Sequence, residues 1–130
     1  MAHFLTPLLR DGGHQLQLRN CRTGRILATT IEPAFDSASR RRGLLGRNSM
    51  ADGSALVIAP SNAVHTAFMR FSIDVIFATR DGRVVKVRRS VAPWRLAATW
   101  RAYAVIELPT GTIERSDTRQ GDRLEFVRGS

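Results

Sequence analysis

Two segments near the start of the chain alternate hydrophobic and polar residues, which is the period of a half-buried β-strand. Residues 14–20 place Leu16 and Leu18 among polar neighbours, and residues 25–31 continue the alternation. The sequence C-R-T-G between them is rich in turn-forming residues. We therefore predict a β-hairpin at this place.

A short helix is predicted to follow the hairpin. Asp36 or Ser37 can cap its N-terminus, because their side-chain oxygens accept hydrogen bonds from backbone N–H groups of the first turn. Arg41, Leu44 and Leu45 then recur at helical spacing. The pattern predicts a helix that ends near residue 45.

The most apolar part of the chain comes next. Residues 54–59 form an uninterrupted apolar run, and residues 64–79 contain a second one, so both are predicted to hold buried strands. In the second run, one strand face carries Ile73, Val75 and Phe77, and the other carries Asp74, Ile76 and Ala78. Asp81-Gly82 then favours a tight turn, and residues 84–89 are predicted to return as the next strand.

The C-terminal part continues the series of short strands. Residues 90–101 show no clean periodicity and are predicted to form a loop packed by its two tryptophans. Residues 103–108 and 123–127 are predicted strands, with a helical turn between them. The whole pattern predicts a mainly β fold: a single antiparallel β-sandwich or barrel-like domain with one or two short helices.

The size of the chain agrees with one domain, since 130 residues at 43% hydrophobic suffice for one core. We assign residues 14–128 to this domain and expect residues 1–13 to form a flexible N-terminal arm. The start of the chain lacks the features of a signal peptide, and no stretch approaches the ~18 apolar residues of a membrane span. Cys21 is the single cysteine, which excludes an internal disulfide and favours a reducing compartment. We predict a cytoplasmic location without membrane association.

The formal net charge is +9, and the basic residues are arginines except for Lys86. Arginine suits phosphate and carboxylate partners, but the near-absence of lysine also fits a compositional habit, which we favour. One basic group surrounds Trp94 and Trp100, a combination that single-stranded nucleic acid prefers. This group comprises Lys86, Arg88, Arg89, Arg95 and Arg101. Nucleic acid is nevertheless not the favoured partner, since the tryptophans could equally fill one end of a barrel.

Several widespread catalytic motifs are absent from the sequence. It contains no G-x-G-x-x-G, no P-loop, no G-x-S-x-G and no C-x-x-C. Dinucleotide, nucleoside triphosphate, serine-hydrolase and thioredoxin-type chemistry therefore lack their usual residues. We predict no cofactor and no metal, because there is no H-E-x-x-H and no cysteine cluster.

A longer series of motifs carries a family resemblance. The chain contains, in this order, R-R-R-G-L-L-G-R, H-T-A-F-M-R-F-S-I-D-V-I-F-A-T-R-D-G-R-V-V, V-I-E-L-P-T-G and Q-G-D-R-L-E-F. Over residues 14–128 it resembles the DUF192 family, also called UPF0127. The resemblance implies a compact, mostly β domain of uncharacterised activity. Where many relatives read W-M-K-N-T, residues 68–72 read F-M-R-F-S, and Ser61 or Asn62 stands where some relatives have cysteine, so no role of those side chains transfers.

Charged residues in and near the apolar run 64–79 indicate either structural ion pairs or a ligand site, because unpaired charges in apolar strands are costly. Asp74 and Glu107 each lie between apolar neighbours, so their carboxylates could face one cleft if their strands are adjacent. With His65 they could hold a metal or share acid and base roles. The structural alternative, which we favour, pairs Asp74 with Arg70 and Glu107 with another arginine.

For function, we favour binding over catalysis. The predicted ligand is a small polar or anionic molecule, or a polar group of a partner, bound in a pocket near the strand that spans residues 65–74. Arginine side chains would supply donors for an anionic group. The predicted binding residues are His65, Thr66, Met69, Arg70, Asp74, Glu107 and Arg41.

Two alternatives remain open at this point. One is a small hydrolase or isomerase that uses Asp74 and Glu107. The other is an arginine-rich adaptor for nucleic acid or protein. The oligomeric state is left open.

Overall fold

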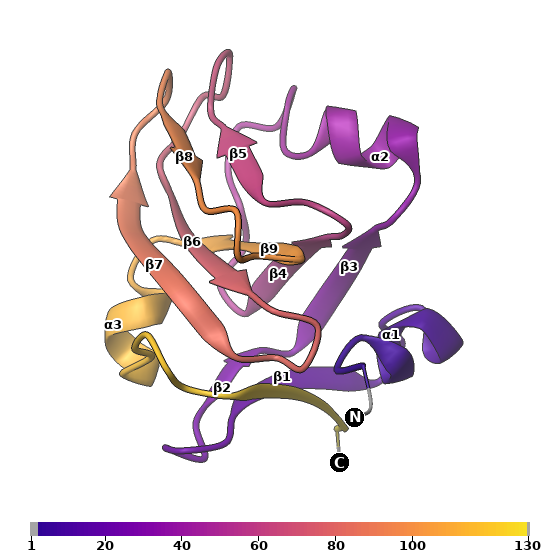
Figure 1. The fold of residues 1–130 in the computed structure, drawn as a ribbon. Helices are drawn as coiled ribbons and strands as arrows, with labels where there is room; N and C mark the ends of the chain where they lie inside the picture. Colours follow the sequence, from indigo (N-terminus) through magenta and orange to yellow (C-terminus); the bar gives the residue numbers. More distant parts are fainter. Residues whose placement is uncertain (1–2, 130) are drawn as a thin grey trace.

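The computed structural model describes residues 3–129 and is mainly β, as predicted (Figure 1). Three short helices occur in this range, where the sequence pattern predicted one or two. The helices are α1 (Thr6–Asp11), α2 (Ser37–Arg42) and α3 (Thr112–Ser116). The strands are β1 (Leu16–Asn20), β2 (Ile26–Ala28), β3 (Thr30–Ala34), β4 (Ser54–Ile58), β5 (Ala63–His65), β6 (Ile73–Ala78), β7 (Val84–Val91), β8 (Leu96–Ala98), β9 (Ala104–Pro109) and β10 (Leu124–Arg128).

The strands form three sheets that are not closed into a barrel. The largest has the order β3-β4-β9-β6-β7, a second has the order β10-β1-β2, and β5 pairs with β8. The pairs are antiparallel except β3–β4, which is parallel. The antiparallel prediction therefore needs a correction at this one edge of the large sheet.

The parallel pair has a direct physical cause in the connection between its strands. Parallel neighbours need a crossover rather than a tight turn, and α2 supplies it between β3 and β4. The predicted cap is confirmed, since the side chain of Asp36 accepts a hydrogen bond from the Ser39 N–H at 2.8 Å. The helix ends at Arg42, and its C-cap is Gly43, which has a positive φ of 47°. The crossover places α2 beside the large sheet.

The large sheet is buried on both faces, which explains why all six residues of β6 and all six of β9 are buried. Alternate side chains of a strand point to opposite faces. Ile76 and Ala78 belong to a first core cluster, whereas Ile73, Val75 and Phe77 belong to a second one. The two faces predicted for this strand are thus confirmed.

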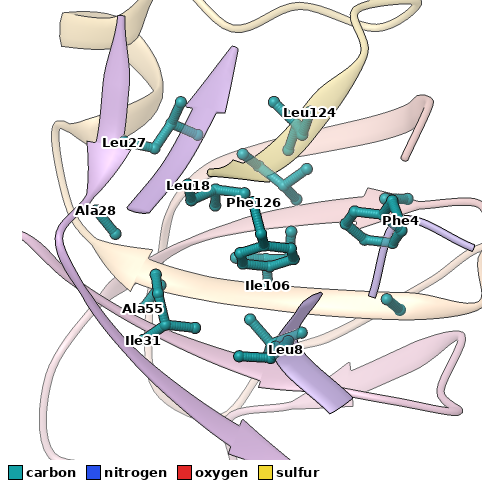
Figure 2. Close-up of a cluster of buried hydrophobic side chains, with 14 of the residues drawn as sticks. Phe4, Leu8, Leu18, Leu27, Ala28, Ile31, Ala55, Ile106, Leu124 and Phe126 are labelled. Carbon is teal, nitrogen blue, oxygen red and sulfur yellow. The ribbon is translucent and has the colours of Figure 1, made fainter. Parts of the chain in front are cut away.

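The first core cluster lies between the large sheet and the sheet of β1, β2 and β10. Figure 2 shows Ile106 of β9 close to Leu18, Phe126 and Leu8. Burial of such side chains supplies the main driving force for folding, about 1.5–3 kcal/mol for each large apolar side chain. This cluster also receives residues from α1 and the segment before it.

The start of the chain differs from the flexible arm predicted for residues 1–13. Phe4, Leu5 and Leu8 are at most 8% exposed and belong to the first core cluster. The Phe4 ring stacks on Phe126 with centroids 5.6 Å apart. These three residues near Pro7 are therefore packed, whereas Leu9 is exposed. Residues 1 and 2 lie outside the described range.

The hairpin of β6 and β7 forms at the predicted turn. Gly82 has a φ of 86°, and a Cβ there would lie 2.4 Å from the Leu124 carbonyl oxygen and 3.1 Å from the Phe4 Cβ. Glycine is thus required at this position by both conformation and space.

The segment 90–101 is more ordered than the predicted loop, because β8 pairs there with β5. Its tryptophans do not pack inward: Trp94 is 61% and Trp100 is 86% exposed. The expectation that they pack the loop or fill a barrel end is therefore wrong. The open sheets leave no barrel end for them to fill.

Candidate ligand-binding site

A cavity of about 650 Å³ lies between α2 and the segment that contains β5, which are neighbours at the top of Figure 1. Its volume falls in the range of small-molecule sites, roughly 300–1,000 Å³. The lining combines arginines from α2, apolar side chains of the second core cluster and one carboxylate. The residues used below are Arg40, Arg41, Arg42, Gly43, His65, Phe68, Met69 and Glu107.

The α2 side of the pocket is basic. The Arg40 guanidinium donates a hydrogen bond to the Phe35 carbonyl oxygen at 2.5 Å, which fixes this side chain against the residues that precede α2. Arg41 and Arg42 are exposed, and neither forms a salt bridge with a residue in the range 3–129. Their guanidinium groups remain available to an anion in the pocket.

Glu107 of β9 supplies the carboxylate of the pocket. It pairs in the sheet with Leu56 and Val75, whose side chains belong to the second core cluster. Only 2% of Glu107 is exposed, and its buried Oε2 has no hydrogen-bond partner among the described residues. Burial raises the pKa of Glu107 to about 7, although the positive charge of Arg47 acts to lower it. Arg47 itself bonds to the Glu32 carboxylate at 2.8 Å.

The opposite wall comes from β5 and the residues that follow it. His65 is exposed and lines the pocket at the end of β5. Met69 is buried in the second core cluster, whereas Phe68 is 71% exposed. This wall offers an apolar surface with one imidazole.

Thr66 lies next to His65 but holds two loops together instead of lining the pocket. Its hydroxyl donates to the Ala92 carbonyl oxygen at 2.6 Å and accepts from the Arg95 N–H at 2.8 Å. The Thr66 backbone also bonds to Arg95 and Trp94. With its hydroxyl fully used and 0% of the residue exposed, Thr66 has a structural role.

Asp74 also has a structural role, because both its carboxylate oxygens are used internally. Oδ1 accepts from the Ser90 N–H and Oδ2 from the Ile113 N–H, each at 2.9 Å. Arg70 is exposed and donates to the Asn48 side chain at 2.7 Å. The predicted pairing of Asp74 with Arg70 is wrong, because backbone N–H groups from β7 and α3 satisfy the carboxylate.

The structure thus divides the predicted binding residues into two groups. Those that line the pocket are Arg41, His65, Met69 and Glu107. Those that do not are Thr66, Arg70 and Asp74. A hydrolase or isomerase that uses Asp74 and Glu107 together would need both carboxylates in one cleft, and the fold does not bring them together.

Two residues of the pocket near α2 were not predicted from the sequence. Arg42 and Gly43 line the pocket although the sequence pattern indicated only Arg41. The available signal was the R-R-R-G motif directly after a capped helix start. The position of this motif near Glu107 depends on the parallel crossover between β3 and β4, which the strand pattern did not reveal.

Two further observations describe the residues 3–129. No group of three or more His, Cys, Asp or Glu side chains is arranged there to hold a metal ion. None of the helices has the length and apolar character needed to cross a lipid bilayer.

Comparison with known proteins gives one family model that matches residues 18–126: DUF192, described as Uncharacterized ACR. A UPF0127 protein of Thermococcus sibiricus is 30% identical over 84% of this chain and 73% of its own length. A UPF0127 protein of Pyrococcus abyssi is 34% identical over 75% of this chain and 86% of its own. A third, from Pyrococcus furiosus, is 42% identical over 51% of this chain, and the match spans only 57% of that relative.

Two solved structures share the fold. A putative transcription regulator from Sinorhizobium meliloti 1021 superposes with a TM-score of 0.75 at 24% identity, over 85% of this chain and 91% of that one. A protein of unknown function from Novosphingobium aromaticivorans gives 0.72 at 21% identity, over 85% and 82%. At such identities the likeness extends to the fold alone.

Proposed function

The chain belongs to the DUF192 (UPF0127) family, and we propose from the geometry that it binds a small anionic ligand in the pocket between α2 and β5. The observation that carries this proposal is the pair Arg41 and Arg42 at a cavity of about 650 Å³. Neither arginine has an acidic partner within residues 3–129. An arginine fork is well suited to a carboxylate or a phosphate.

The walls of the pocket support a molecule with an organic body. Met69 and Phe68 offer apolar contacts, and His65 adds a polar group beside them. Small-molecule sites commonly have this composition, with a mostly apolar lining and few polar groups that orient the ligand. The proposal is for binding, and it assigns no catalytic role to the residues of the pocket.

A thermal-shift screen with acetate, phosphate and small organic anions tests this function. Ligands that bind the folded state should stabilise it by RT ln(1 + [L]/Kd), about 2.7 kcal/mol at a hundredfold excess over Kd. The double variant Arg41→Gln/Arg42→Gln should lose most of this stabilisation.

The matched control is Arg88→Gln/Arg89→Gln, which removes the same charge from two exposed residues of β7. These residues do not line the pocket, so the control should keep the response of the native protein. An equal loss in both double variants would mean that the anions act on the net charge and would refute the proposed site.

A second candidate function is the binding of single-stranded nucleic acid by an exposed aromatic surface near β8. Phe68 and Trp94 contact each other edge to face with centroids 4.6 Å apart, and both are more than 60% exposed. Arg95 and Arg101 are exposed nearby in sequence. Bases stack on such aromatic groups while arginines contact the backbone phosphates.

Fluorescence anisotropy with a labelled single-stranded oligonucleotide tests the second candidate. Affinity should fall by orders of magnitude between ~50 and ~200 mM salt, because phosphate contacts release counterions. Trp94→Ala should weaken binding, whereas Trp94-independent binding would contradict the role of the aromatic surface.

A further inference from the structure

The Glu107 carboxylate is a polar group without a partner at the apolar floor of the pocket. Its Oε2 is buried and accepts no hydrogen bond from residues 3–129. Buried acceptors are nearly always satisfied in folded proteins, so an orphan of this kind needs an explanation. The position of Glu107 in the lining makes a bound molecule the natural source of the missing donor.

None of the residues around Glu107 within the range 3–129 donates a hydrogen bond to Oε2. Its neighbours across the sheet, Leu56 and Val75, are apolar. A Cβ added to Gly43 would lie 3.9 Å from Oε1, so the glycine leaves the space beside the carboxylate without a side chain. Arg47 acts on the carboxylate through its charge, but its own salt bridge is with Glu32.

The geometry points to a ligand that carries a primary ammonium group besides its anionic group, with Glu107 as the acceptor of the ammonium protons. This assignment rests on the anion-binding function proposed above. Such a small zwitterion matches the two kinds of charge in the lining, the arginines of α2 and the carboxylate of β9. A hydrogen bond between two charged groups is roughly twice as strong as one between neutral groups. The ammonium also compensates a buried negative charge, which an alcohol does not.

If the ligand carries an ammonium group, its binding should change the protonation of Glu107. Because burial raises the pKa of Glu107 to about 7 in the free protein, the carboxyl group is partly protonated at neutral pH. An ammonium ligand selects the ionised form, so its binding should release protons at pH 7 and tighten as the pH rises from about 6 to 8. The charged groups that line the pocket beside Glu107 are Arg40, Arg41 and Arg42 from α2 and His65 from β5. Arg47, which follows α2, acts on Glu107 through its positive charge. His65→Gln separates the histidine contribution from that of Glu107.

Matched probes test the ammonium group directly. Calorimetric titrations would compare β-alanine with propionate, 4-aminobutyrate with butyrate, and phosphoethanolamine with ethyl phosphate. In at least one pair, the amino member should bind about tenfold more tightly. A pH-stat titration in weakly buffered sodium chloride would measure the base consumed on binding.

Glu107→Gln keeps the size of the side chain and removes its charge. It should reduce the ratio of affinities within the pair to about one and abolish proton release. The control is Glu114→Gln, which removes an exposed carboxylate from α3 outside the pocket. This control should behave as the native protein does.

The possible results separate the two proposals. Equal binding of both members of every pair would overturn the ammonium assignment and leave the anion site intact. Proton uptake on binding would also overturn it, since Glu107 would then act as a donor to the ligand. Absence of binding by all six probes would overturn the ammonium assignment. The anion site would be refuted as well if the thermal-shift screen showed no response to any anion, or if both double variants lost that response equally.

Discussion

Asp74 and Glu107 extend to opposite faces of the same sheet, although they lie on adjacent strands. In the register of β6 and β9, Asp74 pairs with Leu108, and Glu107 pairs with Val75. Paired residues share a face, and consecutive residues alternate. The offset of one position sends the Asp74 carboxylate towards α3 and the Glu107 carboxylate towards the pocket.

Asp74→Ala is expected to destabilise the fold by about 2–4 kcal/mol, because the backbone N–H groups of Ser90 and Ile113 would lose a charged acceptor and the Ile113 group is buried. Urea denaturation of the variant and the native protein measures this difference. Arg70→Ala is the control, since Arg70 is exposed and its side chain bonds, among residues 3–129, to Asn48 alone. The effect of this variant should stay below about 0.5 kcal/mol. Equal effects of the two variants would contradict the structural role of Asp74.

Glu107→Gln is expected to make the protein more stable at neutral pH. Because the folded-state pKa is about 7 instead of 4.5, the folded protein holds a proton that the unfolded chain has released between these values. The contribution of Glu107 to stability is therefore complete below pH 4.5 and falls by about 3 kcal/mol as the pH rises through 7. The glutamine variant does not ionise at this position, so it does not lose this stability as the pH rises.

Denaturant titrations of the native protein and Glu107→Gln at several pH values between about 4 and 8 measure this effect. The stability difference should grow with pH in favour of the variant. A difference that does not change with pH would show that Glu107 ionises in the folded protein as readily as in the unfolded chain.

Asp122→Asn is expected to lower the stability of the fold at neutral pH, with a smaller effect in acid. Burial acts to raise the pKa of Asp122, but hydrogen bonds from Arg22 and Asn20 outweigh it and lower the pKa to about 2. The resulting stability, about 2 kcal/mol, is present above pH 4 and is lost as the pH falls towards 2. Thermal unfolding at pH 7 and pH 2.5 should therefore show a deficit of the variant that shrinks in acid. A constant deficit would assign the effect to packing.

Gly82→Ala is expected to cost about 2–4 kcal/mol, because the new Cβ would meet the Leu124 carbonyl oxygen at 2.4 Å and the residue has a positive φ. Gly121→Ala is a matched control with a φ of 95° and no atom within 4 Å of the added Cβ. Its cost should be limited to the backbone term, about 1 kcal/mol. Chemical denaturation of both variants separates the close contact from the conformational strain, and equal costs would rule out the contact.

Local sequence patterns determined much of the secondary structure of this protein. The alternation of residues 73–78 predicted which side chains share a face, and the Asp81-Gly82 pair placed the hairpin of β6 and β7. Asp36 was recognisable as a helix cap. These features depend on neighbours in the chain, where strand period, turn conformation and capping act over a few residues.

The tertiary structure alone decided how these elements combine. The parallel pairing of β3 with β4 brings the arginines of α2 to the pocket, and the register of β6 and β9 turns Glu107 rather than Asp74 towards them. The Asp74 carboxylate accepts hydrogen bonds from two backbone N–H groups that lie 16 and 39 residues away in sequence, and it does not pair with Arg70. Strand order, register and hydrogen-bond partners arise from packing between residues distant in sequence, and a shift of one residue exchanges the two faces of a strand.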